Sequence, residues 1–162
     1  MITQYALLVV GVACLMAALV LVLMPRMAAC VPAYVGLLLL HWSYFIAVPV
    51  STFVFWGVAT LLVVGLRHMS PRGEIDGKAS SNLYIGLGAI AGCLLGIIVG
   101  ARVMVLGVIL GAIAGQFMYS RTPDGSWLKM TNRDFWRYFS AKCLPAIVAV
   151  SIIGIAIEGF IF

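Results

Sequence analysis

The chain has 162 residues, of which 64% are hydrophobic and only 9% are charged. Soluble domains usually have about 45–50% apolar and about 25% charged residues, and a fold of this length has too much surface to bury such an excess. The composition therefore excludes a soluble enzyme, a nucleic-acid-binding module and a disordered chain, and it indicates a single integral membrane domain. The net charge of +5 comes from basic residues between apolar runs, where they report on membrane orientation.

The first half of the chain contains three apolar segments. Residues 5–24 are long enough for one helical crossing, because about 20 apolar residues span the hydrocarbon core of a bilayer. The uncharged run 27–66 is too long for one crossing, and Pro49 near its middle predicts a turn that divides it into two. A polar loop at 67–82 follows.

The second half contains three more apolar segments. Two glycine-rich runs on either side of Arg102 are followed by a second polar stretch at 120–140 and a last apolar run. The predicted fold is an all-α transmembrane bundle of about six apolar segments in one domain, at residues 5–24, 27–47, 50–66, 83–101, 103–119 and 141–162.

The positions of the basic residues predict the orientation of this bundle. With six crossings, nine of the ten Lys and Arg residues fall on one side and only Arg102 falls on the other. Because cytoplasmic loops are enriched in Lys and Arg, we expect the loops 67–82 and 120–140 in the cytoplasm. Both termini are then outside, and the location is the cytoplasmic (inner) membrane. A hairpin at 83–119 that enters and returns on one side gives the same charge count, so that alternative stays open.

Glycines recur every four residues in the two segments around Arg102, at Gly88, Gly92, Gly96 and Gly100 and then at Gly107, Gly111 and Gly115. Residues four apart lie on one face of a helix, and a face without side chains lets another backbone approach closely. Each glycine also costs about 1 kcal/mol of helix propensity relative to alanine. The repeat therefore indicates a packing requirement, either a glycine-zipper hairpin within the chain or an oligomer-forming or pore-lining zipper.

The segment GLGAIAGCLLGIIVGARVMVLGVILGAIAGQFMYSR, with the polar link and last apolar segment after it, resembles the bacterial domain-of-unknown-function 456 family. Those small integral membrane proteins carry a glycine-zipper hairpin of this form in the second half of the chain. The resemblance covers roughly residues 84–121. It implies the hairpin fold and a membrane location, and it implies no reaction. Where the family often has Glu after the final zipper glycine, this chain has Gln116.

Helical rise places four polar residues near the outer ends of their segments, namely His41, Tyr44, Arg102 and Glu158. Ionisable groups within a membrane are costly and are therefore candidates for function. Pairing between Arg102 and Glu158 would lower that cost, and the cluster could bind an anionic headgroup or relay protons. The alternative is that both charges reach the headgroups separately while His41 donates to a backbone carbonyl.

Aromatic and basic residues alternate just before the last apolar segment. This pattern predicts a short interfacial helix whose rings lie at headgroup level and whose cations face anionic lipid; a partner-docking surface is the alternative. The residues that carry it are Arg133, Phe135, Trp136, Arg137 and Tyr138.

The sequence contains none of the nucleophile-elbow, zinc-protease or nucleotide-binding motifs that would indicate an enzyme. We therefore expect a noncatalytic membrane protein without cofactor or metal, with a structural, assembly or lipid-interacting role. Its expected partners are membrane lipids and, through the glycine zipper, a second copy of the chain, but not nucleic acid. The alternative function is a small transporter or channel that uses the outer polar cluster.

Overall fold

The computed structural model describes residues 2–23, 29–44, 46, 48–69, 80–125, 136 and 138–161. These residues form helices and no strand, and the bounded α-helices are α1 (Ile2–Leu23), α2 (Cys30–Trp42), α3 (Val50–Met69), α4 (Ser80–Ile97), α5 (Ala101–Ser120) and α7 (Leu144–Ile161). By length and composition, three stretches could each cross a membrane: Ile2–Leu23, Val103–Ser120 and Phe139–Phe160. The chain is thus an all-helical protein with the helices of a membrane protein.

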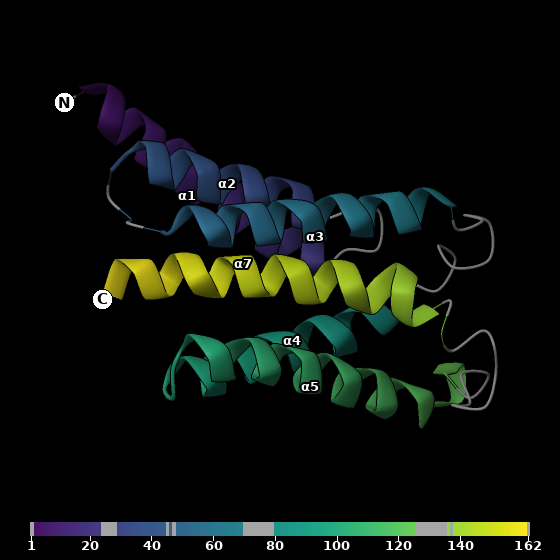
Figure 1. Cartoon of the computed structure of the whole chain (residues 1–162). Coiled ribbons are helices and arrows are strands. Elements are labelled where there is room, and N and C mark those ends of the chain that lie inside the picture. Colours follow the sequence, from purple (N-terminus) through teal and green to yellow (C-terminus); the bar gives the residue numbers. More distant parts are fainter. Residues whose placement is uncertain are drawn as a thin grey trace.

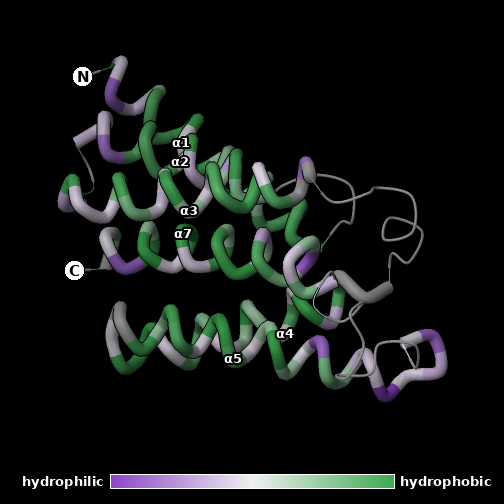
Figure 2. The backbone as a smooth tube through the Cα atoms, turned by 45° about the vertical axis from the view of Figure 1, so that its right-hand side comes forward, coloured by the Kyte–Doolittle hydropathy of each residue, from purple (hydrophilic) through white to green (hydrophobic). Residues whose placement is uncertain are grey.

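Successive helices run in alternating directions, so that both termini lie at the same end of the bundle (Figure 1). We call this the terminal end; α2 and α4 also end there, and α3 and α5 begin there. At the opposite end, which we call the loop end, α1, α3 and α5 finish and α7 begins. Figure 2 shows hydrophobic residues along the helices and hydrophilic ones gathered mainly toward their ends.

α2 is shorter than the apolar segment predicted at 27–47. It has 13 residues, which gives a length of about 20 Å against the roughly 30 Å of a hydrocarbon core. The helix stops because the Ser43 hydroxyl donates to the carbonyl of Leu40 over 2.6 Å and Tyr44 takes the left-handed backbone conformation with φ of 63°. α3 then begins at Val50, directly after Pro49.

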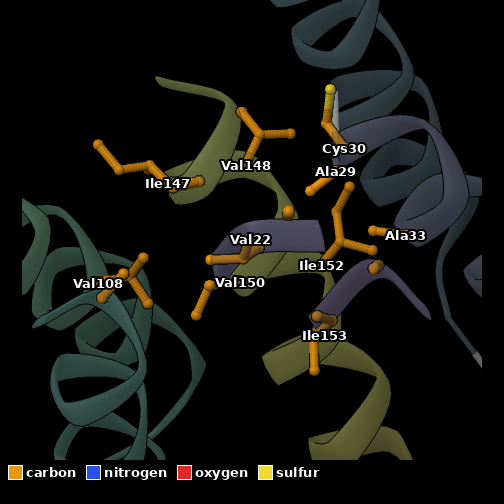
Figure 3. Packing of buried hydrophobic residues seen from close by; sticks show 14 of the residues in the cluster. Val22, Ala29, Cys30, Ala33, Val108, Ile147, Val148, Val150, Ile152 and Ile153 are labelled. Atoms are coloured by element: carbon orange, nitrogen blue, oxygen red, sulfur yellow. The ribbon is translucent and has the colours of Figure 1, made fainter. Parts of the chain in front are cut away.

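α7 is the central helix of the bundle. It packs against the other five α-helices, and residues 145–154 are all buried. α1, α2 and α3 lie on one side of it and α4 and α5 on the other (Figure 1). The close view in Figure 3 shows Val108 of α5 on one side of α7 and Ala33 and Cys30 of α2 on the other. A helix that is apolar on every face suits either the centre of a bundle or contact with lipid, and among the described α-helices α7 is the one that contacts all the others.

α7 is preceded by a π-helical turn, η2 (Phe139–Cys143). There the N–H of Leu144 donates to the carbonyl of Phe139, five residues earlier. The next residue, Pro145, has no N–H to continue the regular ladder. Proline and π-helical turns are the usual causes of helix irregularity, and here the two lie side by side at the loop end.

Candidate functional site

The glycines of α4 and α5 lie directly against each other. A Cβ built on Gly92 would fall onto the carbonyl oxygen of Gly107, and a Cβ on Gly107 would fall onto that of Gly92. The same reciprocal arrangement joins Gly88 and Gly111. At both levels the two backbones touch with no side chain between them, the kind of contact that drives helix association inside lipid.

Two further levels extend this contact along the hairpin. Gly96 lies against the backbone of Met104, and Gly115 lies against the carbonyl of Tyr84. Gly100 differs from the other glycines of the repeat: it lies at the tip with φ of 135°, and nothing lies within 4 Å of a Cβ built there. Its four-residue spacing predicts a packing role. In the structure Gly100 instead allows the turn between α4 and α5, because glycine adopts a positive φ without steric cost.

Close glycine contacts also occur outside the repeat. Gly11 of α1 and Gly36 of α2 face each other, and a Cβ on Gly36 would lie 3.0 Å from the carbonyl oxygen of Gly11. A Cβ built on Gly154 of α7 would fall onto the sulfur atoms of Met104 and Cys93, which belong to the hairpin. No four-residue repeat marks Gly11 and Gly36, so the sequence pattern did not single out these two glycines.

The residues expected as an outer polar cluster all lie on helix ends at the terminal end, but the described side chains do not form a bonded group. The His41 ring packs on Phe53 of α3, with centroids 4.7 Å apart. Tyr44 is 86% exposed and Glu158 is half-buried. No hydrogen bond or ion pair joins these three side chains, and the side chain of Arg102 lies outside the described part of the chain.

The backbone nevertheless places Arg102 and Glu158 on facing elements. Glu158 lies one helical turn beyond Gly154, on the same face of α7. That face packs against the hairpin, because Gly154 contacts Met104 of α5. Arg102 lies at the hairpin tip and precedes Met104 by two residues, so it occupies a different face of α5, in register with Leu106 and Leu110, which are 59% and 66% exposed. The elements face each other, but the register of α5 does not by itself direct Arg102 toward Glu158.

A second set of polar residues meets at the loop end, and we call it the loop-end cluster. It consists of Gln116, Tyr119, Tyr138, Lys142 and Cys143, all of which are buried. The thiol of Cys143 donates to Oε1 of Gln116 over 3.0 Å, which links α5 to the start of α7. The rings of Tyr119 and Tyr138 stack with centroids 6.4 Å apart. Among the described residues, Nε2 of Gln116 has no hydrogen-bond partner.

The loop-end cluster corrects one prediction about the interfacial helix. Tyr138, expected at the membrane interface, is only 1% exposed, because its ring lies on Tyr119 and not on the surface. Burial also raises the pKa of its phenol. Trp136 is 65% exposed and so has the exposure expected of an anchor. Arg133, Phe135 and Arg137 lie outside the described residues.

These contacts hold helices together. Within the described ranges, no set of three or more His, Cys, Asp or Glu side chains could hold a metal ion. The Cys143 thiol is hydrogen-bonded to an amide and not to a base, so the bond links two helices and does not activate a nucleophile. Comparisons with family models, with curated proteins and with solved structures found no match. The resemblance of residues 84–121 to a glycine-zipper membrane family therefore stays a prediction.

Proposed function

We propose that this chain is a noncatalytic integral membrane protein whose packed helices themselves perform a structural, assembly or lipid-interacting role. The proposal places it in the cytoplasmic membrane, with all six helices embedded and both termini outside. The observation that carries it is the direct backbone contact of α4 and α5 at Gly92 and Gly107. A hairpin packed this closely is a rigid unit, because at the Gly88–Gly111 and Gly92–Gly107 levels no side chain lies between the two backbones that could adapt to movement.

The packing of α7 supports the same conclusion. Residues 146–150 in its first half are Ala, Ile, Val, Ala and Val, and all are buried. Apolar side chains fill this part of the bundle axis, where a conducting protein would need polar groups or water. The glycine faces of α4 and α5 are also occupied by each other. A second copy of the chain would need to use another surface or open the hairpin.

Distance measurements across the hairpin test the proposed rigidity. Spin labels on Leu87→Cys and Leu110→Cys would lie on α4 and α5 next to the Gly88–Gly111 contact, at positions that are 53% and 66% exposed. We expect one narrow distance distribution that is the same in detergent, in liposomes and in liposomes with a proton gradient. Two interconverting distances would contradict a static packing role.

The alternative, a small transporter or channel, has one observation in its favour. Nδ1 of His41 is buried without a hydrogen-bond partner among the described residues, and Glu158 is half-buried on α7 at the same end. Such groups are typical of proton or ion pathways in membranes. Liposomes that contain the protein should show no proton or potassium flux above empty liposomes. Flux that Glu158→Gln or His41→Ala abolishes would support transport and overturn the proposed role.

A further inference from the structure

The turn after α2 presents two large aromatic side chains outward, while three described residues of the same turn are buried. Trp42 is 69% exposed and Tyr44 is 86% exposed. Ser43 between them is 1% exposed, and Ile46 and Val48 just beyond are 2% and 8% exposed. The buried residues thus hold the turn against the rest of the bundle, while the two aromatic rings remain exposed.

The outward position of Tyr44 is held at the expense of backbone strain. Its φ of 63° is the only positive φ of a non-glycine residue among those described. Left-handed backbone at the end of a helix usually belongs to glycine, because a Cβ is disfavoured there. The Tyr44 N–H donates to the carbonyl of His41, and the Ser43 N–H donates to that of Leu39, each over 3.0 Å. Strain that is kept in place by such bonds often marks a residue with a role beyond stability.

We infer that Trp42 and Tyr44 form an aromatic anchor that binds the headgroup and glycerol region of a phospholipid bilayer at the terminal end of the bundle. This inference rests on the proposed membrane role and adds a specific lipid-binding surface to it. Trp and Tyr rings combine an apolar body with a polar tip, and they gather where hydrocarbon meets headgroups.

The surroundings of the turn favour a lipid surface as the occupant. The next helix along the chain, α3, also exposes apolar side chains: Val50, Val54 and Phe55 are 72%, 61% and 64% exposed. At the loop end, Trp136 is 65% exposed. The bundle therefore presents large aromatic rings at both ends with an apolar surface between them, as proteins with an aromatic belt at each interface do.

The anchor predicts a specific depth for each ring. One variant keeps Trp42 and replaces the other three tryptophans, Trp56, Trp127 and Trp136, by Phe. Two further variants replace all four tryptophans by Phe and add Tyr44→Trp or, as the matched control, Phe55→Trp. Phe55 is nearly as exposed as Trp42 but lies about 8 Å further along α3 from the terminal end.

Fluorescence quenching in phosphatidylcholine liposomes then compares lipids that are spin-labelled at the headgroup with lipids labelled deep in the acyl chain. We expect headgroup-labelled lipid to quench the probes at 42 and 44 at least twofold more than deep-labelled lipid, and the reverse order for the probe at 55. Two results would contradict the anchor while the probe at 55 is quenched by deep-labelled lipid. In the first, the probes at 42 and 44 are quenched only by aqueous iodide; in the second, they are quenched by deep-labelled lipid as strongly as the probe at 55. Failure of the unsubstituted protein to float with liposomes would instead overturn the membrane role itself.

Discussion

Gly92 of α4 and Gly107 of α5 lie so close together that a Cβ on either would overlap the carbonyl oxygen of the other. The contact is reciprocal, so neither helix can accept a side chain at this level without moving away from its partner. Since Gly154 of α7 contacts Met104 of the same hairpin, movement of α5 would also disturb the central helix. A single methyl group added at this level should therefore lower the stability of the whole bundle.

Substitution of Gly92 tests this dependence. We expect Gly92→Ala to lower the free energy of unfolding by about 1–2 kcal/mol, because the cost of overpacking that moves backbone, at the upper end of about 1–3 kcal/mol, exceeds the gain of about 1 kcal/mol in helix propensity. Unfolding followed by helical circular dichroism during titration with SDS in mixed micelles measures it. The matched control is Gly65→Ala on α3, where nothing lies within 4 Å of the added Cβ. Equal effects of the two substitutions would refute the packing argument.

Gly100 should be sensitive for a different reason. A Cβ there meets no atom within 4 Å, but its φ of 135° is a conformation that residues with a side chain rarely adopt. We expect Gly100→Ala to destabilise the protein by about 1–3 kcal/mol through backbone strain alone. The same SDS titration gives the value. Full stability of Gly100→Ala would mean that the hairpin tip has another conformation.

The hydrogen bond between Cys143 and Gln116 predicts a non-additive pair of substitutions. Cys143→Ala leaves the buried Gln116 amide without its 3.0 Å partner and should cost about 1–3 kcal/mol. Gln116→Met keeps the length of the side chain and removes the buried amide, so its cost should be within about 1 kcal/mol of zero or favourable. Cys143→Ala should then cost less in the Gln116→Met background than in the original chain. Identical costs in both backgrounds would show that the two residues are not coupled.

The predicted pair of Arg102 and Glu158 can be tested in the same way. The register of α7 places Glu158 on the face toward the hairpin, one turn beyond Gly154. If the two charges pair, Arg102→Ala and Glu158→Ala should each lower the thermal unfolding midpoint in detergent, and the double variant should lose less than the sum. A coupling of about 0.5 kcal/mol or more is expected for residues in contact. Additive losses would favour separate contacts with the headgroups.

The sequence predicted the helical class and the main division of the chain, because both follow from composition and from single strong signals. The break near Pro49 lies directly before α3, and the spaced glycines lie on α4 and α5, where they contact the facing backbone. It could not separate Gly100 from its neighbours in the repeat, since spacing carries no information about φ. It also missed Gly11 and Gly36, which belong to different helices and form a contact only after α1 and α2 pack.

The side-chain neighbours were harder to predict than the helices. Helical rise placed His41 at the terminal end, but its packing on Phe53 depends on how α2 and α3 are arranged. Tyr138 belongs to a stretch whose composition is that of an interfacial helix, yet its ring is buried on Tyr119. The π-helical turn that begins at Phe139 follows it directly. Such a local irregularity changes which residues face inward, and the spacing of apolar residues in the sequence does not predict it.

The central claim is that this bundle lies in a membrane with its terminal end on one side and its loop end on the other. A membrane-impermeant maleimide tests it on sealed, oriented vesicles that carry Ile2→Cys, Tyr44→Cys, His68→Cys or Asp124→Cys, each at an exposed position. The unsubstituted chain gives the background of the natural cysteines, of which Cys14 is half-buried and Cys30, Cys93 and Cys143 are buried. We predict that positions 2 and 44 react from one side and positions 68 and 124 from the other. Reaction of positions 68 and 124 from opposite sides would contradict the claim.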